Sequence, residues 1–130
     1  MIALDTHAWL WWAAGETERL SEGAREAIAG ARLVKVSAIS CWELASLVRR
    51  GRIEIGDRPV ERWVSDVEAT YPLEIVPVDR RTAMRAGALP DDFPGDPADR
   101  IVYATAVLED VPLVTADRAI RAFDPARTIW

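Results

Sequence analysis

The most constraining feature of the sequence is a helical stretch without charge. Residues 101–108, IVYATAVL, contain no charged side chain, and a helix with no polar face has to be covered on most of its surface. It follows residues 95–100, GDPADR, in which Pro97 suits a first helical position and Asp96 suits the cap before it. We therefore expect other layers to pack around this helix and to hold Asp99 in its first turn.

Short apolar runs alternate with helical segments along the whole chain. The expected strands are residues 1–4, 33–36, 73–78, 112–115 and 128–130. The expected helices are residues 7–14, 21–29, 38–50, 59–71, 80–88, 97–110 and 117–123. Alternation of this kind predicts βαβ units and an α/β fold, a three-layer α/β/α sandwich around a mostly parallel sheet of four or five strands. At 130 residues the chain is one domain, 1–130.

The segment 38–50 gives two more local predictions. Ser40 and Glu43 have the spacing of a capping box. Apolar side chains recur with helical spacing, which predicts a face turned toward the core; they are Ile39, Trp42, Leu44, Ala45, Leu47 and Val48.

Composition limits the classes of function. The net charge is −5, which argues against a protein that coats nucleic acid through a basic surface, so any contact with nucleic acid is local or uses metal ions. All basic residues except Lys35 are arginine, the side chain best suited to bidentate phosphate contacts. The single cysteine, Cys41, allows no intramolecular disulfide, and no segment reaches membrane-spanning length. We therefore expect a soluble, cytoplasmic protein.

Four acidic residues are expected at one edge of the sheet. Asp5 follows the first strand and Asp117 the fourth, while Glu43 and Asp99 lie on the neighbouring helices. Ligands bind at the carboxyl ends of parallel strands, and gathered carboxylates need protonation, arginine partners or a hard cation. Oxygen ligands favour Mg²⁺ or Mn²⁺, and a single histidine, His7, argues against zinc. Taken singly, Asp5 and Asp117 are equally explained as helix caps.

Four ordered motifs resemble a known family. Residues 5–7 (DTH), 36–44 (VSAISCWEL), 95–100 (GDPADR) and 115–117 (TAD) are similar to PIN domains, and more narrowly to the toxins of VapBC-type toxin–antitoxin modules. The resemblance implies an α/β/α sandwich and a Mg²⁺- or Mn²⁺-dependent endoribonuclease, a hydrolase that is inhibited by an antitoxin and forms a homodimer. The matched acids, expected to be catalytic and to bind the metal, are Asp5, Glu43, Asp99 and Asp117.

A fifth acid leaves the third metal ligand open between two positions. Asp96 lies three residues before Asp99, and spacing alone does not decide which of them faces the metal. We favour Asp99, because it leads directly into the apolar helix as the family's third acid does.

Other polar side chains are candidates for binding substrate or orienting ligands. The hydroxyls of Thr6, Ser37 and Thr115 lie at the ends of expected strands, where they equally suit ordinary caps. Arg100 and Arg118 follow the acids directly and can contact RNA phosphates. The first expected helix is rich in tryptophan, with Trp9, Trp11 and Trp12. Packing in the core or at an interface explains these side chains better than stacking on bases does.

Other functions compete with the nuclease interpretation. A phosphoryl-accepting receiver domain has the same size and sheet, but Asp5 has no acidic neighbour and the only lysine, Lys35, lies in the second strand. That function is rejected. A catalytically inactive PIN-like binding module that keeps only its antitoxin or dimer interface stays open, and the presence of all four acids speaks against it. A nuclease acting on DNA also stays open, because no residue that reads the 2′-OH of RNA can be identified from the sequence.

Overall fold

The computed structural model describes all residues, 1–130, and is built on one parallel sheet. Five strands lie in the order β3-β2-β1-β4-β5, and every neighbouring pair is parallel. The strands are β1 (Ile2–Leu4), β2 (Val34–Ser37), β3 (Leu73–Val76), β4 (Leu113–Val114) and β5 (Thr128–Ile129). The first and fourth strands are neighbours, which is the condition for the four acids to converge on one edge. Chain order runs outward from β1 on both sides, so the switch point of the sheet lies between β1 and β4.

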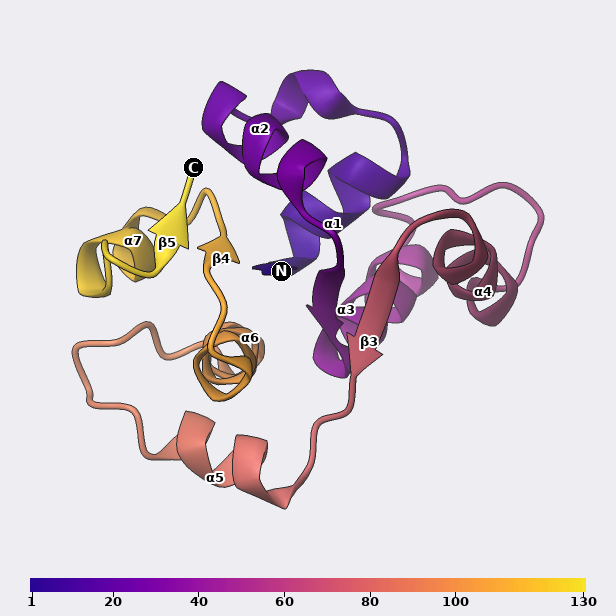
Figure 1. Cartoon of the computed structure of the whole chain (residues 1–130). Coiled ribbons are helices and arrows are strands. Elements are labelled where there is room, and N and C mark those ends of the chain that lie inside the picture. The colour runs from indigo at the N-terminus through magenta and orange to yellow at the C-terminus, as the bar shows by residue number, and fades with distance from the viewer.

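Helices join the strands and cover both faces of the sheet. They are α1 (Thr6–Ala13), α2 (Glu22–Gly30), α3 (Ala38–Arg49), α4 (Val60–Thr70), α5 (Arg80–Gly87), α6 (Pro97–Glu109) and α7 (Arg118–Phe123), with a short 3₁₀ turn at Thr17–Arg19. Figure 1 shows α1, α2 and α4 on one side of the row of strands, and α5 and α6 on the other. The predicted three-layer sandwich is confirmed. None of these helices has both the length and the apolar character needed to cross a membrane.

Two hydrophobic clusters fill the spaces between the layers. In β1, Ile2 and Leu4 belong to one cluster, which also receives α1, α2, α3 and α4, whereas Ala3 belongs to the other, beneath α6 and α7. Leu113 and Val114 of β4 divide in the same way. Side chains alternate across a strand, so a continuous apolar run supplies both cores at once.

The cap of α3 differs from the prediction. Ser37 is the N-cap, and its hydroxyl accepts a hydrogen bond from the Ile39 N–H at 3.2 Å. Ser40 therefore lies inside the helix, and the predicted capping box between Ser40 and Glu43 is wrong. The helix begins directly where β2 ends, which leaves no room for a cap three residues later.

The tryptophans of α1 serve the core, as predicted. Trp9 is fully buried and meets the Trp63 ring edge-on at 5.9 Å between centroids. Trp12 packs on Tyr71 at 4.7 Å. The prediction for Trp42 is wrong: 64% of its surface is exposed, so it belongs to no core face of α3.

Candidate active site

Acidic side chains flank the switch point of the sheet. Asp5 follows β1, and its N–H donates to the Val114 carbonyl of β4 at 3.1 Å. Asp117 is the third residue after the end of β4. The carboxyl ends of these adjacent strands therefore bring the two acids to one edge, as the sequence predicts.

Asp5 is both a helix cap and a perturbed acid. Its Oδ1 accepts from the Ala8 N–H at 2.9 Å and caps α1. Burial raises the pKa of Asp5, while hydrogen bonds from Thr115 and Ala8 oppose that shift and the nearby charge of Asp117 adds to it. The charge of His7 opposes that of Asp117, and the partly buried carboxylate forms no ion pair with Arg or Lys, so it is poised for a cation or a proton.

Asp96 and Asp117 are also N-caps. Asp117 Oδ1 accepts from the Ile120 N–H at 2.9 Å, which begins α7. Asp96 Oδ1 accepts from the Asp99 N–H at 3.1 Å, which begins α6 with Pro97 in its first turn. Both acids are thus tied to local backbone through one oxygen, as their capping interpretation predicts, and each has a second carboxylate oxygen.

Asp99 differs from the other three aspartates of the cluster because it caps no helix. Its carboxylate accepts no hydrogen bond and joins no ion pair within the chain. The pKa of Asp99 is raised to about 7, most strongly by burial and then by the negative charges of four neighbours; in decreasing order these are Asp96, Asp117, Glu43 and Asp5. All five acids therefore share one electrostatic environment.

Glu43 is held in place by a chain of hydroxyl groups. It lies on α3, and the Thr6 hydroxyl donates to its Oε1 in a short hydrogen bond. The Ser40 hydroxyl lies 2.8 Å from the same Thr6 oxygen. Thr6 and Ser40 are both buried. The role of Ser40 as a support for Glu43 was missed, because sequence spacing suggested a capping box instead.

The three candidate hydroxyl residues are buried and orient acids or helices. The exposed fractions of Thr6, Ser37 and Thr115 are 4%, 2% and 0%. Thr115 accepts from the Asp117 N–H at 3.1 Å, and Ser37 caps α3. Orientation of the acids by Thr6 and Thr115 agrees with this geometry, and contact of the three hydroxyls with substrate stays a prediction.

Arg100 is engaged with the backbone. Its guanidinium donates to four carbonyl oxygens at 2.9–3.1 Å, those of Ala86, Leu89, Pro90 and Pro94. These carbonyls belong to the end of α5 and the loop that enters α6, so Arg100 fixes the approach to Asp99. Four of its five N–H donors are thus engaged, which leaves little capacity for the expected phosphate contact of Arg100.

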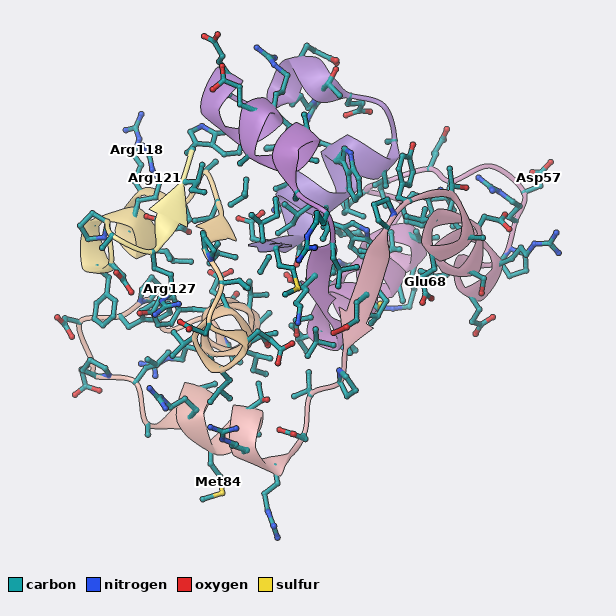
Figure 2. All side chains as sticks on the ribbon, viewed as in Figure 1. Asp57, Glu68, Met84, Arg118, Arg121 and Arg127 are labelled. Atoms are coloured by element: carbon teal, nitrogen blue, oxygen red, sulfur yellow. The ribbon has the colours of Figure 1, made fainter.

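Arg118 remains available for an anion. It is exposed and belongs to none of the ion pairs of the chain. Figure 2 labels Arg118 and Arg121 on α7, close to β5. Both line a shallow hollow of about 470 Å³ that also includes Trp130. None of the five acids lines that hollow, so contact of Arg118 with substrate stays a prediction.

The donor set of the cluster suits a hard divalent cation. It offers carboxylate oxygens from five residues, and Asp99 has no cationic partner to balance its charge. As the side chains stand, no three His, Cys, Asp or Glu groups meet closely enough to form a ready-made ligand shell. The chemistry of the residues therefore fits Mg²⁺ or Mn²⁺, with adjustment of the side chains on binding.

Comparison with known proteins places this fold and site in a family. A family model described as "PIN domain" matches residues 2–125. The chain is 42% identical to Ribonuclease VapC22 of Mycobacterium tuberculosis over 132 aligned residues, which cover 99% of this chain and 98% of that protein.

Two solved structures share the fold. The chain resembles a toxin–antitoxin complex from Klebsiella pneumoniae, with a TM-score of 0.71, 20% identity and coverage of 100% and 97% of the two chains. It also resembles VapBC2 from Rickettsia felis bound to a promoter DNA fragment, with a TM-score of 0.65, 17% identity and coverage of 98% and 97%. With its parallel sheet and its acidic residues gathered at the switch point, this chain belongs to the PIN domain family.

Proposed function

We propose that this chain is the ribonuclease toxin of a toxin–antitoxin module, acting in the cytoplasm on RNA phosphodiester bonds. The observation that carries the proposal is the uncompensated acidic cluster around Asp99. The 42% identity to a ribonuclease over nearly the full length of both chains supports it.

We propose Mg²⁺ or Mn²⁺ as the cofactor, held by Asp5, Glu43, Asp99 and Asp117. When bound, such an ion supplies positive charge that stabilises the phosphate in the transition state and makes water a stronger nucleophile at neutral pH. We assign Asp99, and not Asp96, as the third metal ligand. The Asp99 carboxylate is unpaired and half-buried, whereas Asp96 is exposed and caps α6.

The remaining residues position these acids. Thr6 and Ser40 orient Glu43 through their hydroxyl groups. Thr115 hydrogen-bonds to Asp5 and to the backbone of Asp117. Arg100 fixes the loop that enters α6. Supports of this kind keep catalytic groups within reach of one another and fix their orientation.

The proposed partners are RNA, a cognate antitoxin and a second copy of the chain. The two structural relatives are described as toxin–antitoxin assemblies, which supports the antitoxin. Size-exclusion chromatography with light scattering, with and without the antitoxin encoded beside this chain, measures both associations. A monomeric chain that does not bind that antitoxin would contradict this part of the proposal.

Cleavage of RNA by the purified chain, free of copurified antitoxin, tests the activity. Mixtures of tRNA, rRNA and mRNA are incubated with Mg²⁺, Mn²⁺ or EDTA, using wild type, Asp99→Asn and the control Asp92→Asn, an exposed acid of the same loop. We expect discrete cleavage that needs metal, persists in the control and disappears in Asp99→Asn.

Two other outcomes have definite meanings. Cleavage that persists in Asp99→Asn would move the third ligand to Asp96 and contradict the assignment made here. Absence of cleavage together with absence of Mn²⁺ binding would contradict the nuclease function and favour the inactive binding module.

A further inference from the structure

One tryptophan lies outside the core. Trp42 on α3 is 64% exposed, whereas the five other tryptophans are buried or half-buried. It belongs to neither hydrophobic cluster and packs on no other aromatic ring. Exposure of an indole forfeits the apolar burial that a core position would give, so packing within this chain does not account for Trp42.

Trp42 lines a groove that opens on the acidic cluster. The groove has a volume of about 600 Å³, and the start of α6 forms its opposite wall with Asp96 and Pro97. One stripe of α3 forms most of the remaining lining, with Trp42, Glu43 and Arg50 along it, and His7 of α1 also contributes. Since Glu43 lies in that stripe, the groove is continuous with the candidate active site.

Charge is distributed unevenly along the groove. Glu43 and Asp96 make one part acidic, while Arg50, at the C-terminal end of α3, is exposed and joins no ion pair. Seven residues of helix separate Glu43 from Arg50, which is about 10 Å at 1.5 Å per residue. An aromatic face therefore lies beside the acids, with a free guanidinium farther along.

We propose that this groove binds single-stranded RNA, with a nucleobase stacked on the Trp42 indole and a flanking phosphate at Arg50. The inference rests on the proposed ribonuclease function and adds a substrate contact to it. Sequence-tolerant single-strand binding combines aromatic stacking with positively charged contacts to the backbone. Trp42 directly precedes Glu43, so a base seated on the indole positions the adjoining phosphodiester beside the acidic cluster.

Binding is measured separately from cleavage. A fluorescein-labelled, mixed-sequence single-stranded oligoribonucleotide is titrated into the full chain carrying Asp99→Asn, with Trp42 either unchanged or replaced by Ala or Phe. Stacking is worth about 1–3 kcal/mol per base, so we expect Trp42→Ala to weaken binding about 5- to 150-fold. Trp42→Phe keeps an aromatic face and restores most of the affinity.

The matched control removes another exposed apolar side chain. Met84 is 67% exposed on α5, and Figure 2 shows it projecting from that helix away from the other elements. Met84→Ala leaves RNA affinity unchanged. With Asp99 intact, Trp42→Ala raises KM for RNA more than it lowers kcat, and Arg50→Ala reduces the dependence of binding on salt.

Three outcomes overturn the inference. If wild type cleaves RNA and Trp42→Ala leaves both KM and RNA affinity unchanged, the stacking contact is wrong while the proposed function stands. If Trp42→Ala changes only the oligomeric state in light scattering, the indole belongs to an interface between copies. If wild type neither binds nor cleaves RNA, the proposed function and the inference fail together.

Discussion

Two clusters of partly buried charge in this molecule differ in how their charges are compensated. Lys35 of β2 is 12% exposed, and its Nζ lies 2.6 Å from Glu109 and 3.7 Å from Glu74. Hydrogen bonding to Glu109 raises the pKa of Lys35. At the switch point, Asp99 lies near four other acids and joins no ion pair.

The difference separates a structural site from a functional one. Around Lys35, opposite charges from β2, β3 and α6 satisfy one another within the chain. Around Asp99 the charges repel, which costs stability unless a proton or a cation is supplied. Sites that bind ligands commonly retain such a cost, because the groups that compensate it would also block the ligand.

The largest expected effect comes from breaking the compensated cluster. Lys35→Met leaves Glu109 and Glu74 without their partner, and we expect the free energy of unfolding at pH 7 to fall by about 3 kcal/mol. The pair contributes fully below the ordinary lysine pKa and is lost above the raised one, so the difference should vanish in strong alkali. Urea unfolding of the variant measures it. A loss no greater than that of Glu74→Gln would contradict this account.

The next effect concerns the support of Asp99. Arg100→Ala removes four hydrogen bonds to loop carbonyls and a guanidinium 5.8 Å from the centre of the Phe93 ring. We expect a loss of about 2 kcal/mol in the free energy of unfolding. RNA cleavage should lose kcat, with KM little changed, because the acid is misplaced and no phosphate contact is lost. A rise in KM with unchanged kcat would instead indicate that Arg100 contacts a substrate phosphate, which would contradict its supporting role.

The smallest expected effect is a gain, and not a loss, in the free energy of unfolding. Because folding raises the pKa of Asp99 to about 7, the metal-free native state binds more protons than the unfolded chain between pH 4 and 7. Its stability therefore falls as pH rises through that range. Asp99→Asn removes this penalty, and we expect it to stabilise the metal-free chain by about 1–2 kcal/mol at pH 8, discounted for partial solvation. Urea midpoints from pH 5 to 8 test the sign, and a destabilised variant would contradict it.

Most of the fold is predictable from the sequence because its signals are local. Apolar runs bounded by Pro, Gly or Asp mark the strands, and Asp96 with Pro97 marks the start of α6. The short strands β4 and β5 are found through the same runs. The 3₁₀ turn at Thr17–Arg19 was missed, since a single turn has no periodicity to detect.

The acidic cluster is predictable from topology, whereas side-chain roles are not. A residue that follows a parallel strand must lie at its carboxyl end, which places Asp5 and Asp117. The engagement of Arg100 and the exposure of Trp42 depend on which neighbours each side chain meets. Helical spacing groups Trp42 with core positions, but 64% of its surface is exposed.

The central claim is that the acidic cluster binds a divalent cation through Asp99, and metal titration tests it most directly. Isothermal calorimetry with Mn²⁺ compares wild type, Asp99→Asn and the capping variant Asp96→Asn at pH 8 and at pH 6. We predict binding by wild type that weakens at pH 6, where a proton competes for Asp99. We also predict a loss of about tenfold or more in Asp99→Asn and a smaller loss in Asp96→Asn. Equal Mn²⁺ affinity in wild type and Asp99→Asn would contradict the claim.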